Sequence, residues 1–246
     1  MDCEHINPYR DDRRSKSQQV REMFDNIAPA YDFMNRAMTF GIDRRWRRKA
    51  VDMLRRRPHD AILDVATGTG DLAMLMARRT DAQAITGIDL SEGMIEVGRR
   101  KIREAGLESR ITLTAGDCLN MPFADGVFDA VTVAYGVRNF ENLHQGYVEM
   151  LRVLRPGGTI MVIELSTPAS PVIRPLYNLY TRHIIPAVGR LVSKDVRAYS
   201  YLPESIAAVP QRDAMTALMR QAGFDNAQWR QLTFGTCIIY TAVKPG

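Results

Sequence analysis

Short apolar runs rich in β-branched residues alternate with helix-length segments through the middle of the chain, and this alternation constrains the fold more than any other feature. The five runs, each expected to be a strand, are Ala61–Ala66, Ala84–Asp89, Arg110–Ala115, Phe128–Ala134 and Thr159–Glu164. The helices expected between them are Asp71–Arg79, Ser91–Glu104 and Glu141–Leu154. Strands that alternate with helices form βαβ units, which predicts an α/β fold on a doubly wound parallel sheet.

The pattern changes after the fifth run. A further helix is expected at Gln211–Gln221, and Gly223 ends it. Two last strand-like runs, Gln228–Phe234 and Thr236–Val243, are separated by Gly235. Runs joined by so short a turn predict an antiparallel hairpin, which completes a mostly parallel sheet of seven strands.

No linker rich in Pro, Gly or Ser divides the chain, so we expect one domain over residues 1–246. Residues of about 18–57 are predicted to form an N-terminal helical extension that acts as a lid, and residues of about 167–210 an insertion on the substrate side. Hydrophobic residues make up 46% of the chain and charged residues 25%, which excludes a disordered, collagen-like or coiled-coil protein.

Cysteine usage and the N-terminal sequence bear on location. Cys3, Cys118 and Cys237 form no close pair, so neither a disulfide framework nor a cysteine-ligated zinc site is predicted. The N-terminus contains no apolar signal segment, and no stretch approaches the roughly 18 apolar residues that a membrane-spanning helix needs. We therefore expect a cytoplasmic protein.

Basic residues gather in one segment. Between Arg44 and Arg57 there are eight cations and a single acid, Asp52. Such a segment can contact anionic lipid headgroups, nucleic acid or an acidic partner, and it can equally be a solvated helix face.

A glycine-rich turn follows the first predicted strand. Gly68, Thr69 and Gly70 lead directly into the first predicted helix, where glycine permits close approach of a ligand and the helix N-terminus offers free amide groups. Asp89 ends the second predicted strand 19 residues after Gly70, a spacing typical of an acid that binds ribose hydroxyls. The pattern predicts a cofactor that contains a nucleoside.

Two further acids favour S-adenosylmethionine over a dinucleotide. Asp64 lies inside the first predicted strand, and Asp117 lies just past the third. A carboxylate at 117 can accept a hydrogen bond from the adenine amino group, with the amide of Cys118 close to the ring. Carboxylates near a pyrophosphate would be unfavourable.

These segments resemble known motifs. LDVATGTGD (63–71), GIDLSEGM (87–94) and GDCLNMPFADGVFD (116–129) are similar to the successive cofactor motifs of class I S-adenosylmethionine-dependent methyltransferases. Together with YDFMN (31–35), YGVRN (135–139), RVLRPGGTIMVIELS (152–166), LVSKDVRAYSYLPESI (191–206) and PQRDAMTALMRQAGF (210–224), they resemble the menaquinone/ubiquinone C-methyltransferase family. The resemblance runs from about Val20 to Lys244.

The resemblance implies a Rossmann-like fold and transfer of a methyl group to a ring carbon of a reduced polyprenyl quinone precursor. The implied acceptor is most often demethylmenaquinol, and a methoxy-polyprenyl benzoquinol of ubiquinone biosynthesis is a second candidate. The reaction requires no metal. The residues implied to line the cofactor site are Thr69, Asp89, Asp117 and Cys118.

The chain departs from the family pattern at two places. Thr39 and Asp43 stand before Trp46 where the family usually has Ser and His, and Tyr240 replaces a common His. These departures favour, as an alternative, a methyltransferase with a different small-molecule acceptor. A binding module for RNA or protein is a weaker alternative, because the motif residues Gly68, Gly70, Asp89 and Asp117 are intact. A dehydrogenase is the third alternative, which a shift of melting temperature with NAD rather than S-adenosylmethionine would identify.

The expected chemistry selects one arginine. A ring carbon is a weak nucleophile until the adjacent phenol, whose pKa is about 10, loses its proton, so the site must stabilise a phenolate. Arg138 follows the fourth predicted strand, at the carboxyl end of the parallel sheet, where such folds bind ligands. It is our candidate catalytic residue, because a guanidinium can stabilise a phenolate. The alternative is a structural arginine that donates to loop carbonyls.

Candidate substrate contacts are Tyr31, Asn139 and Tyr199. Tyr31, with Asp32 and Asn35, would belong to the lid, or else to ordinary helix packing. Weaker candidates for a base are Asp43, His144 and His183. Asp43 suits the N-cap position of a helix, and His144 falls on a predicted surface helix.

The expected partner is a prenylated quinol. The apolar and aromatic run at 171–192 is predicted to line an isoprenoid groove or to cap the sheet, and the basic segment at 44–57 to hold the protein on an anionic membrane surface at the inner face of the plasma membrane. No nucleic acid partner is expected. A homodimer is compatible with the sequence, although no motif indicates one.

Overall fold

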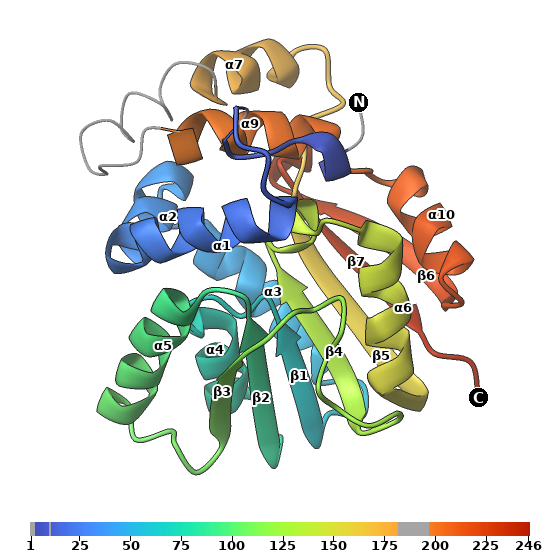
Figure 1. Cartoon of the computed structure of the whole chain (residues 1–246). Helices are drawn as coiled ribbons and strands as arrows, with labels where there is room; N and C mark the ends of the chain where they lie inside the picture. The colour runs from blue at the N-terminus through green and yellow to red at the C-terminus, as the bar shows by residue number, and fades with distance from the viewer. Residues whose placement is uncertain (1–2, 10, 182–196) are drawn as a thin grey trace.

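A seven-stranded sheet forms the centre of the molecule in the computed structural model, which describes residues 3–9, 11–181 and 197–246, with the side chains of 197–200 left aside (Figure 1). The strand order is β3-β2-β1-β4-β5-β7-β6. The strands are β1 (Ala61–Val65), β2 (Ala84–Asp89), β3 (Ile111–Ala115), β4 (Phe128–Ala134), β5 (Leu154–Leu165), β6 (Asp225–Leu232) and β7 (Cys237–Val243). The predicted α/β class and mostly parallel sheet are confirmed.

The C-terminal hairpin has its second strand inside the sheet. β7 pairs antiparallel with both β5 and β6, so β6 forms the edge and points the same way as the five parallel strands. The turn between β6 and β7 is a 3-10 turn, η5 (Thr233–Gly235), rather than Gly235 alone.

Helices cover both faces of the sheet. The core on one face contains apolar residues of α3 (Asp43–Leu54), α4 (Asp71–Arg79) and α5 (Glu92–Glu104). The core on the other face contains residues of α6 (Leu143–Val153) and α10 (Asp213–Gln221). Successive strand residues alternate between the two cores, as in Ile62 and Leu63, because side chains along a strand point to opposite faces.

A third layer lies over the carboxyl ends of the parallel strands (Figure 1). Its helices are α1 (Lys16–Ile27), α2 (Tyr31–Thr39), α7 (Ile173–Leu179) and α9 (Arg197–Ala208). Two carboxylates fix the N-terminal part of this layer to the sheet domain. Asp25 accepts hydrogen bonds from Ser91 Oγ (2.6 Å) and Gly93 N (2.9 Å) at the start of α5, and Asp32 accepts from Lys101 Nζ (2.5 Å) farther along that helix.

The basic helix α3 differs from its prediction at the first residue. Ile42 is the N-cap, and Asp43 is the first helical residue, buried with an exposed fraction of 2%. Trp46 and Arg47 are buried on the same helix. Seven of the eight cations at 44–57 are exposed, all but Arg47. Asp43 is therefore not the N-cap that its sequence position suggested.

Close packing between α5 and the glycine-rich turn yields a stability prediction. A Cβ added at Gly98 would lie 2.6 Å from Leu113 Cδ1 and 3.1 Å from the carbonyl carbon of Thr69. Gly98→Val should therefore lower the free energy of unfolding by about 1–3 kcal/mol. Urea denaturation measures the change. Glu96→Val on the exposed side of the same helix should cost only about 0.5 kcal/mol, and equal losses in the two variants would contradict the packing argument.

Candidate functional site

A cavity lies beneath α1 at the carboxyl ends of β1, β2 and β4. Four of the predicted cofactor residues line it, namely Gly68, Asp89, Asp117 and Cys118. Phe24 of α1 also contributes to the lining. We call this the strand-end cavity. The structure thus brings together residues from three separate motifs of the sequence.

Asp89 is held rigidly in this cavity. Its Oδ2 accepts a hydrogen bond from Gly68 N (2.8 Å), and its Oδ1 accepts from Ser91 N (2.9 Å). Burial raises the pKa of Asp89 to about 6, although the two amide donors lower it. A carboxylate has about four lone-pair positions, so acceptor capacity remains for a diol.

Asp117 and Cys118 form the far wall. Asp117 Oδ1 accepts from Leu119 N (2.9 Å), which fixes the turn after β3. Burial raises the pKa of the Cys118 thiol well above its ordinary value, so the thiol is neutral. The wall therefore offers one carboxylate beside an uncharged, compact side chain.

Thr69 and Gly70 lie outside the cavity lining, in contrast to the predicted contacts. The Thr69 hydroxyl donates to Asp32 Oδ1 (2.6 Å), so it fastens α2 to the turn. Gly70 is the N-cap of α4, with φ at 76°, a conformation that favours glycine. Their part in this structure is to shape the turn that carries Gly68.

Asp64 also lies outside the cavity. It is 1% exposed within β1 and accepts hydrogen bonds from the hydroxyls of Thr67 and Thr132, both at 2.6 Å. Burial raises its pKa to about 6. Asp64 therefore stands behind the turn and does not face a ligand.

A second cavity, of about 280 Å³, opens between α2, α3, α7 and α9. We call it the aromatic cavity, because its lining includes Phe40, Trp46, Tyr135, Tyr177 and Tyr180. Tyr31 and Tyr135 line both this cavity and the strand-end cavity. A ligand in one cavity can therefore approach a ligand in the other at this shared wall.

Arg138 lies in the wall of the aromatic cavity, on the 3-10 turn η3 (Val137–Asn139). Its Nη1 donates to Glu164 Oε1 (2.9 Å) and to the carbonyl oxygen of Tyr135. Burial raises the pKa of Glu164, whereas the adjacent guanidinium lowers it. The Nε of Arg138 is buried with no partner among the described residues, so one donor is left for a ligand.

Backbone strain occurs at the ends of β1 and β4, at Tyr135 of the shared wall and at Ala66 in the lining of the strand-end cavity. Ala66 follows β1 with φ at 51°, and Tyr135 follows β4 with φ at 60°. Such conformations are unfavourable for residues with a Cβ and gather at functional sites. The Arg47 guanidinium carbon lies 5.4 Å from the centre of the Tyr135 ring, within the range of a cation–π contact.

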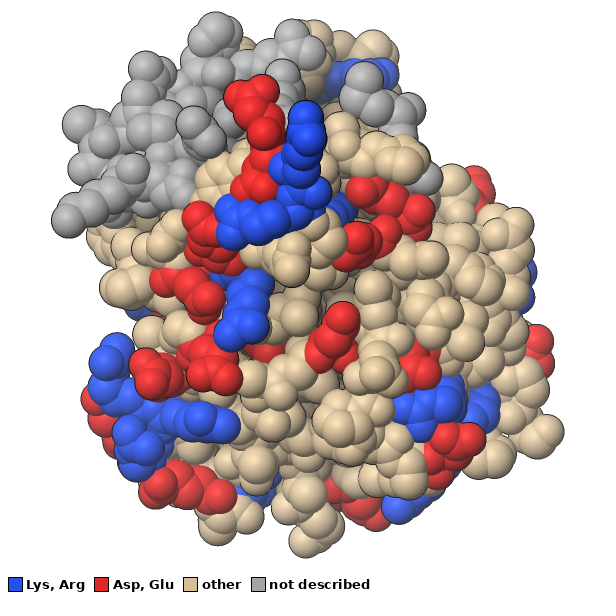
Figure 2. All heavy atoms as spheres, viewed as in Figure 1, with Lys and Arg blue, Asp and Glu red and all other residues tan. Residues whose placement is uncertain are grey.

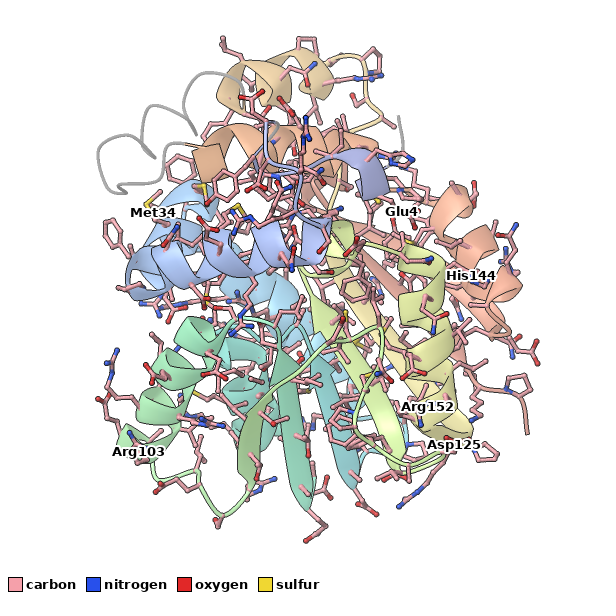
Figure 3. All side chains as sticks on the ribbon, viewed as in Figure 1. Glu4, Met34, Arg103, Asp125, His144 and Arg152 are labelled. Atoms are coloured by element: carbon pink, nitrogen blue, oxygen red, sulfur yellow. The ribbon has the colours of Figure 1, made fainter. Side chains whose placement is uncertain are left out.

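The remaining predicted residues are dispersed. Asn139 lines the strand-end cavity and accepts a hydrogen bond from the Tyr201 hydroxyl (3.1 Å). The side chain of Tyr199, and His183 as a whole, lie outside the described residues. His144 is exposed on the outer side of α6, away from both cavities (Figure 3).

Sequence reasoning named Asp43 only as a weak candidate base and missed Arg47, its partner in the wall of the aromatic cavity. Asp43 and Arg47 line it together, and Asp43 Oδ2 accepts from Arg47 Nη1 at 2.6 Å. Their spacing of four residues on α3 was a usable signal, because it places both on one helix face with Trp46 nearby. The many exposed arginines around this pair instead indicated a solvated or membrane-binding helix face.

Comparison with known proteins gives relatives over almost the whole chain. The sequence matches the ubiE/COQ5 methyltransferase family over residues 12–244. A demethylmenaquinone methyltransferase of Bacteroides fragilis is 48% identical over 241 residues, 98% of each chain. A ubiquinone/menaquinone biosynthesis C-methyltransferase UbiE of Geotalea daltonii is 45% identical over 230 residues, 93% of this chain and 97% of the relative.

Solved structures agree on the fold. The [4+2]-cyclase SpnF aligns with a TM-score of 0.67 at 20% identity, over 93% of this chain and 96% of its own. Phosphoethanolamine N-methyltransferase 2 of Haemonchus contortus, solved in complex with S-adenosyl-L-methionine, aligns with a TM-score of 0.60 at 14% identity, over 81% of this chain and 53% of its own. The family match and the close relatives confirm the resemblance: the chain belongs to the ubiE/COQ5 methyltransferase family.

Proposed function

We propose that the protein is an S-adenosylmethionine-dependent methyltransferase that methylates a ring carbon of a reduced polyprenyl quinone precursor, most directly demethylmenaquinol. A methoxy-polyprenyl benzoquinol is the second acceptor, because relatives at 45% identity are named for both quinone pathways. The observation that carries the proposal is the meeting of two cavities at Tyr31 and Tyr135, one with acids suited to a nucleoside and one lined by aromatic rings.

The strand-end cavity fits the cofactor. Asp89 has acceptor capacity for the two ribose hydroxyls, and Asp117 for the adenine amino group. Gly68 lines the cavity together with Asp89, and Cys118 lines it next to Asp117, where its amide would be available to the adenine ring. When bound, S-adenosylmethionine supplies a methyl carbon activated by a positively charged sulfur.

The shared wall controls the approach of the acceptor. Methyl transfer requires the ring carbon, the methyl carbon and the sulfur to lie in line, so positioning supplies much of the rate. Tyr31 and Tyr135 stand where the two ligands would meet, and burial raises the pKa of both phenols. Both side chains are therefore neutral and leave the ring oxygen of the acceptor as the group that ionises.

Arg138 stabilises that ring oxygen. Its guanidinium is buried in the wall of the aromatic cavity, and its Nε has no partner among the described residues. Donors fixed before the reaction stabilise developing charge without reorganisation. The bonds to Tyr135 and Glu164 hold the guanidinium in place, so the structural and the catalytic interpretations of Arg138 are compatible.

The acceptor assay tests the function directly. Purified protein is incubated anaerobically with labelled S-adenosylmethionine and, separately, a short-chain demethylmenaquinol, a methoxy-polyprenyl benzoquinol and a soluble phenol. We expect label on a ring carbon of a prenylated quinol and none on the phenol. Cofactor binding without transfer to either quinol would refute this acceptor class and leave a methyltransferase for another small molecule.

Removal of Arg138 should reduce turnover much more than cofactor affinity. Because loss of the arginine alone would strand the buried Glu164 carboxylate, the variant is Arg138→Met combined with Glu164→Gln. We expect turnover to fall about 10²–10³-fold, the range for loss of one stabilising donor. Calorimetric binding of S-adenosylhomocysteine serves as the control and should be nearly unchanged. Wild-type turnover in the double variant would remove Arg138 from the mechanism.

We further propose contact with an anionic membrane surface. Val172, Leu176 and Leu179 are 83%, 69% and 57% exposed at helical spacing along α7, while Tyr177 and Tyr180 line the aromatic cavity. Figure 2 shows acidic and basic side chains interspersed over α1 and α5. The seven exposed cations of the segment 44–57 lie on α3 and in the three residues that follow it. Across the described residues, no helix combines the length and apolarity needed to cross a bilayer.

Vesicle sedimentation tests the membrane contact. Vesicles with about one-third anionic lipid should bind the protein at low salt and release it at high salt, because screening weakens contacts between exposed charges. Leu176→Asp with Leu179→Asp should weaken binding. Val127→Asp, an exposed apolar position outside α7, should not. Binding that is absent, or that salt leaves unchanged, would contradict the proposal.

A further inference from the structure

Asp43 is a buried acid in the wall of the aromatic cavity that the mechanism above does not use. It is 2% exposed and stands at the first position of α3. Its Oδ2 accepts a hydrogen bond from Arg47 Nη1 (2.6 Å). Its Oδ1 lies 2.9 Å from Thr39 Oγ1, whose single proton is shared with the carbonyl oxygen of Asn35 (2.7 Å). Each oxygen thus has at most one donor among the described residues, and each keeps a lone pair.

The surrounding residues keep this carboxylate in one orientation. Arg47 is 7% exposed, and its Nη1 also lies 3.4 Å from Asp71 Oδ2. Its guanidinium lies over the ring of Tyr135, which belongs to the shared wall. Thr39 in turn ends α2. Thr39, Asp43 and Arg47 all line the aromatic cavity, so the carboxylate is held in place at the cavity wall, where its remaining lone pairs can accept from a ligand.

A carboxylate distinguishes the two redox forms of a quinone ring. An ionised carboxylate only accepts hydrogen bonds. The ring hydroxyl of a quinol donates a hydrogen bond, whereas the carbonyl of an oxidised quinone only accepts one and would be repelled. Only the reduced ring has the electron-rich carbon that the transfer requires, so rejection of the oxidised ring prevents an unproductive complex.

We propose that Asp43 is a specificity-determining residue that accepts a hydrogen bond from a ring hydroxyl of the acceptor and so selects the quinol over the quinone. The inference rests on the proposed function, because it assumes that the ring occupies the aromatic cavity. Arg138 donates to the ring from its own part of the same wall, and its donors suit either redox form. The carboxylate of Asp43 therefore accounts for the discrimination between quinol and quinone.

The affinity ratio for the two redox forms tests the inference. A short-chain demethylmenaquinone and its quinol are titrated anaerobically into protein saturated with S-adenosylhomocysteine, and the two dissociation constants are compared. A hydrogen bond to a charged group is worth enough to change affinity about 10–100-fold, so the wild type should favour the quinol by that factor. Asp43→Asn should bring the ratio to within about threefold, because its amide donates to a quinone carbonyl.

Asp71→Asn is the matched control. It removes the more distant carboxylate beside Arg47 (3.4 Å), which does not line the cavity, and keeps the 2.6 Å bond from Arg47 to Asp43, so the ratio should stay near the wild-type value. S-adenosylhomocysteine binding shows that each variant is folded. If Asp43 serves only as the ion-pair partner of Arg47, affinity for both forms will fall together and the ratio will persist, which overturns the inference.

The same preparations separate this inference from the proposed function. A wild-type protein that methylates the quinol but binds both redox forms equally overturns the role of Asp43 alone. A wild-type protein that binds neither form and transfers no methyl group overturns the proposed function, and the role of Asp43 with it. Selective binding of the quinol that Asp43→Asn abolishes supports both.

Discussion

The reversal of strand order between the paired strands β1 and β4, at the middle of the sheet, is the constraint on which both cavities depend. Strand order reverses there, with β2 and β3 on one side and β5, β7 and β6 on the other. Such a reversal leaves a crevice at the carboxyl ends of the two strands. Ala66 and Tyr135 close the strands with positive φ, and a Cβ on Gly136 would lie 2.6 Å from Ala66 Cβ. The backbone at the ends of the two strands therefore fixes the position of Tyr135 in the shared wall.

A chain of ion pairs connects this crevice to the layer above it. Asp43 pairs with Arg47, Arg47 contacts Asp71, Asp71 pairs with Lys101, and Lys101 pairs with Asp32 on α2. The members at the aromatic cavity are buried and those nearer α2 are partly exposed, so salt screens only the latter effectively. Helices α2, α3, α4 and α5 are thus joined by charge as well as by apolar packing. A shift of α2 would therefore alter the ion pairs that reach Arg47 and Asp43 in the wall of the aromatic cavity.

Local sequence patterns predicted the sheet and the strand-end cavity because their determinants are local. Strand runs have their own periodicity, and Gly68 and Asp89 occupy fixed places at strand ends, so their meeting follows from parallel pairing alone. The central position of β7 was not predictable in this way, because it depends on pairing with β5 far along the chain. Asp43 was predicted only as a weak candidate base and Arg47 not at all, because the cavity in whose wall they pair is formed by four helices from separate parts of the chain.

The charges around the aromatic cavity are matched before any ligand enters. Arg138 faces Glu164 at 2.9 Å, and Arg47 faces Asp43 at 2.6 Å, so each buried guanidinium has a buried carboxylate. A ligand that arrives as an anion would meet the Asp43 carboxylate as well as both guanidinium groups, and desolvation would oppose its entry. A neutral ring that gains charge only in the transition state meets donors already in position, among them the buried Nε of Arg138. The cavity is therefore suited to an acceptor that enters uncharged and becomes negative as its carbon reacts.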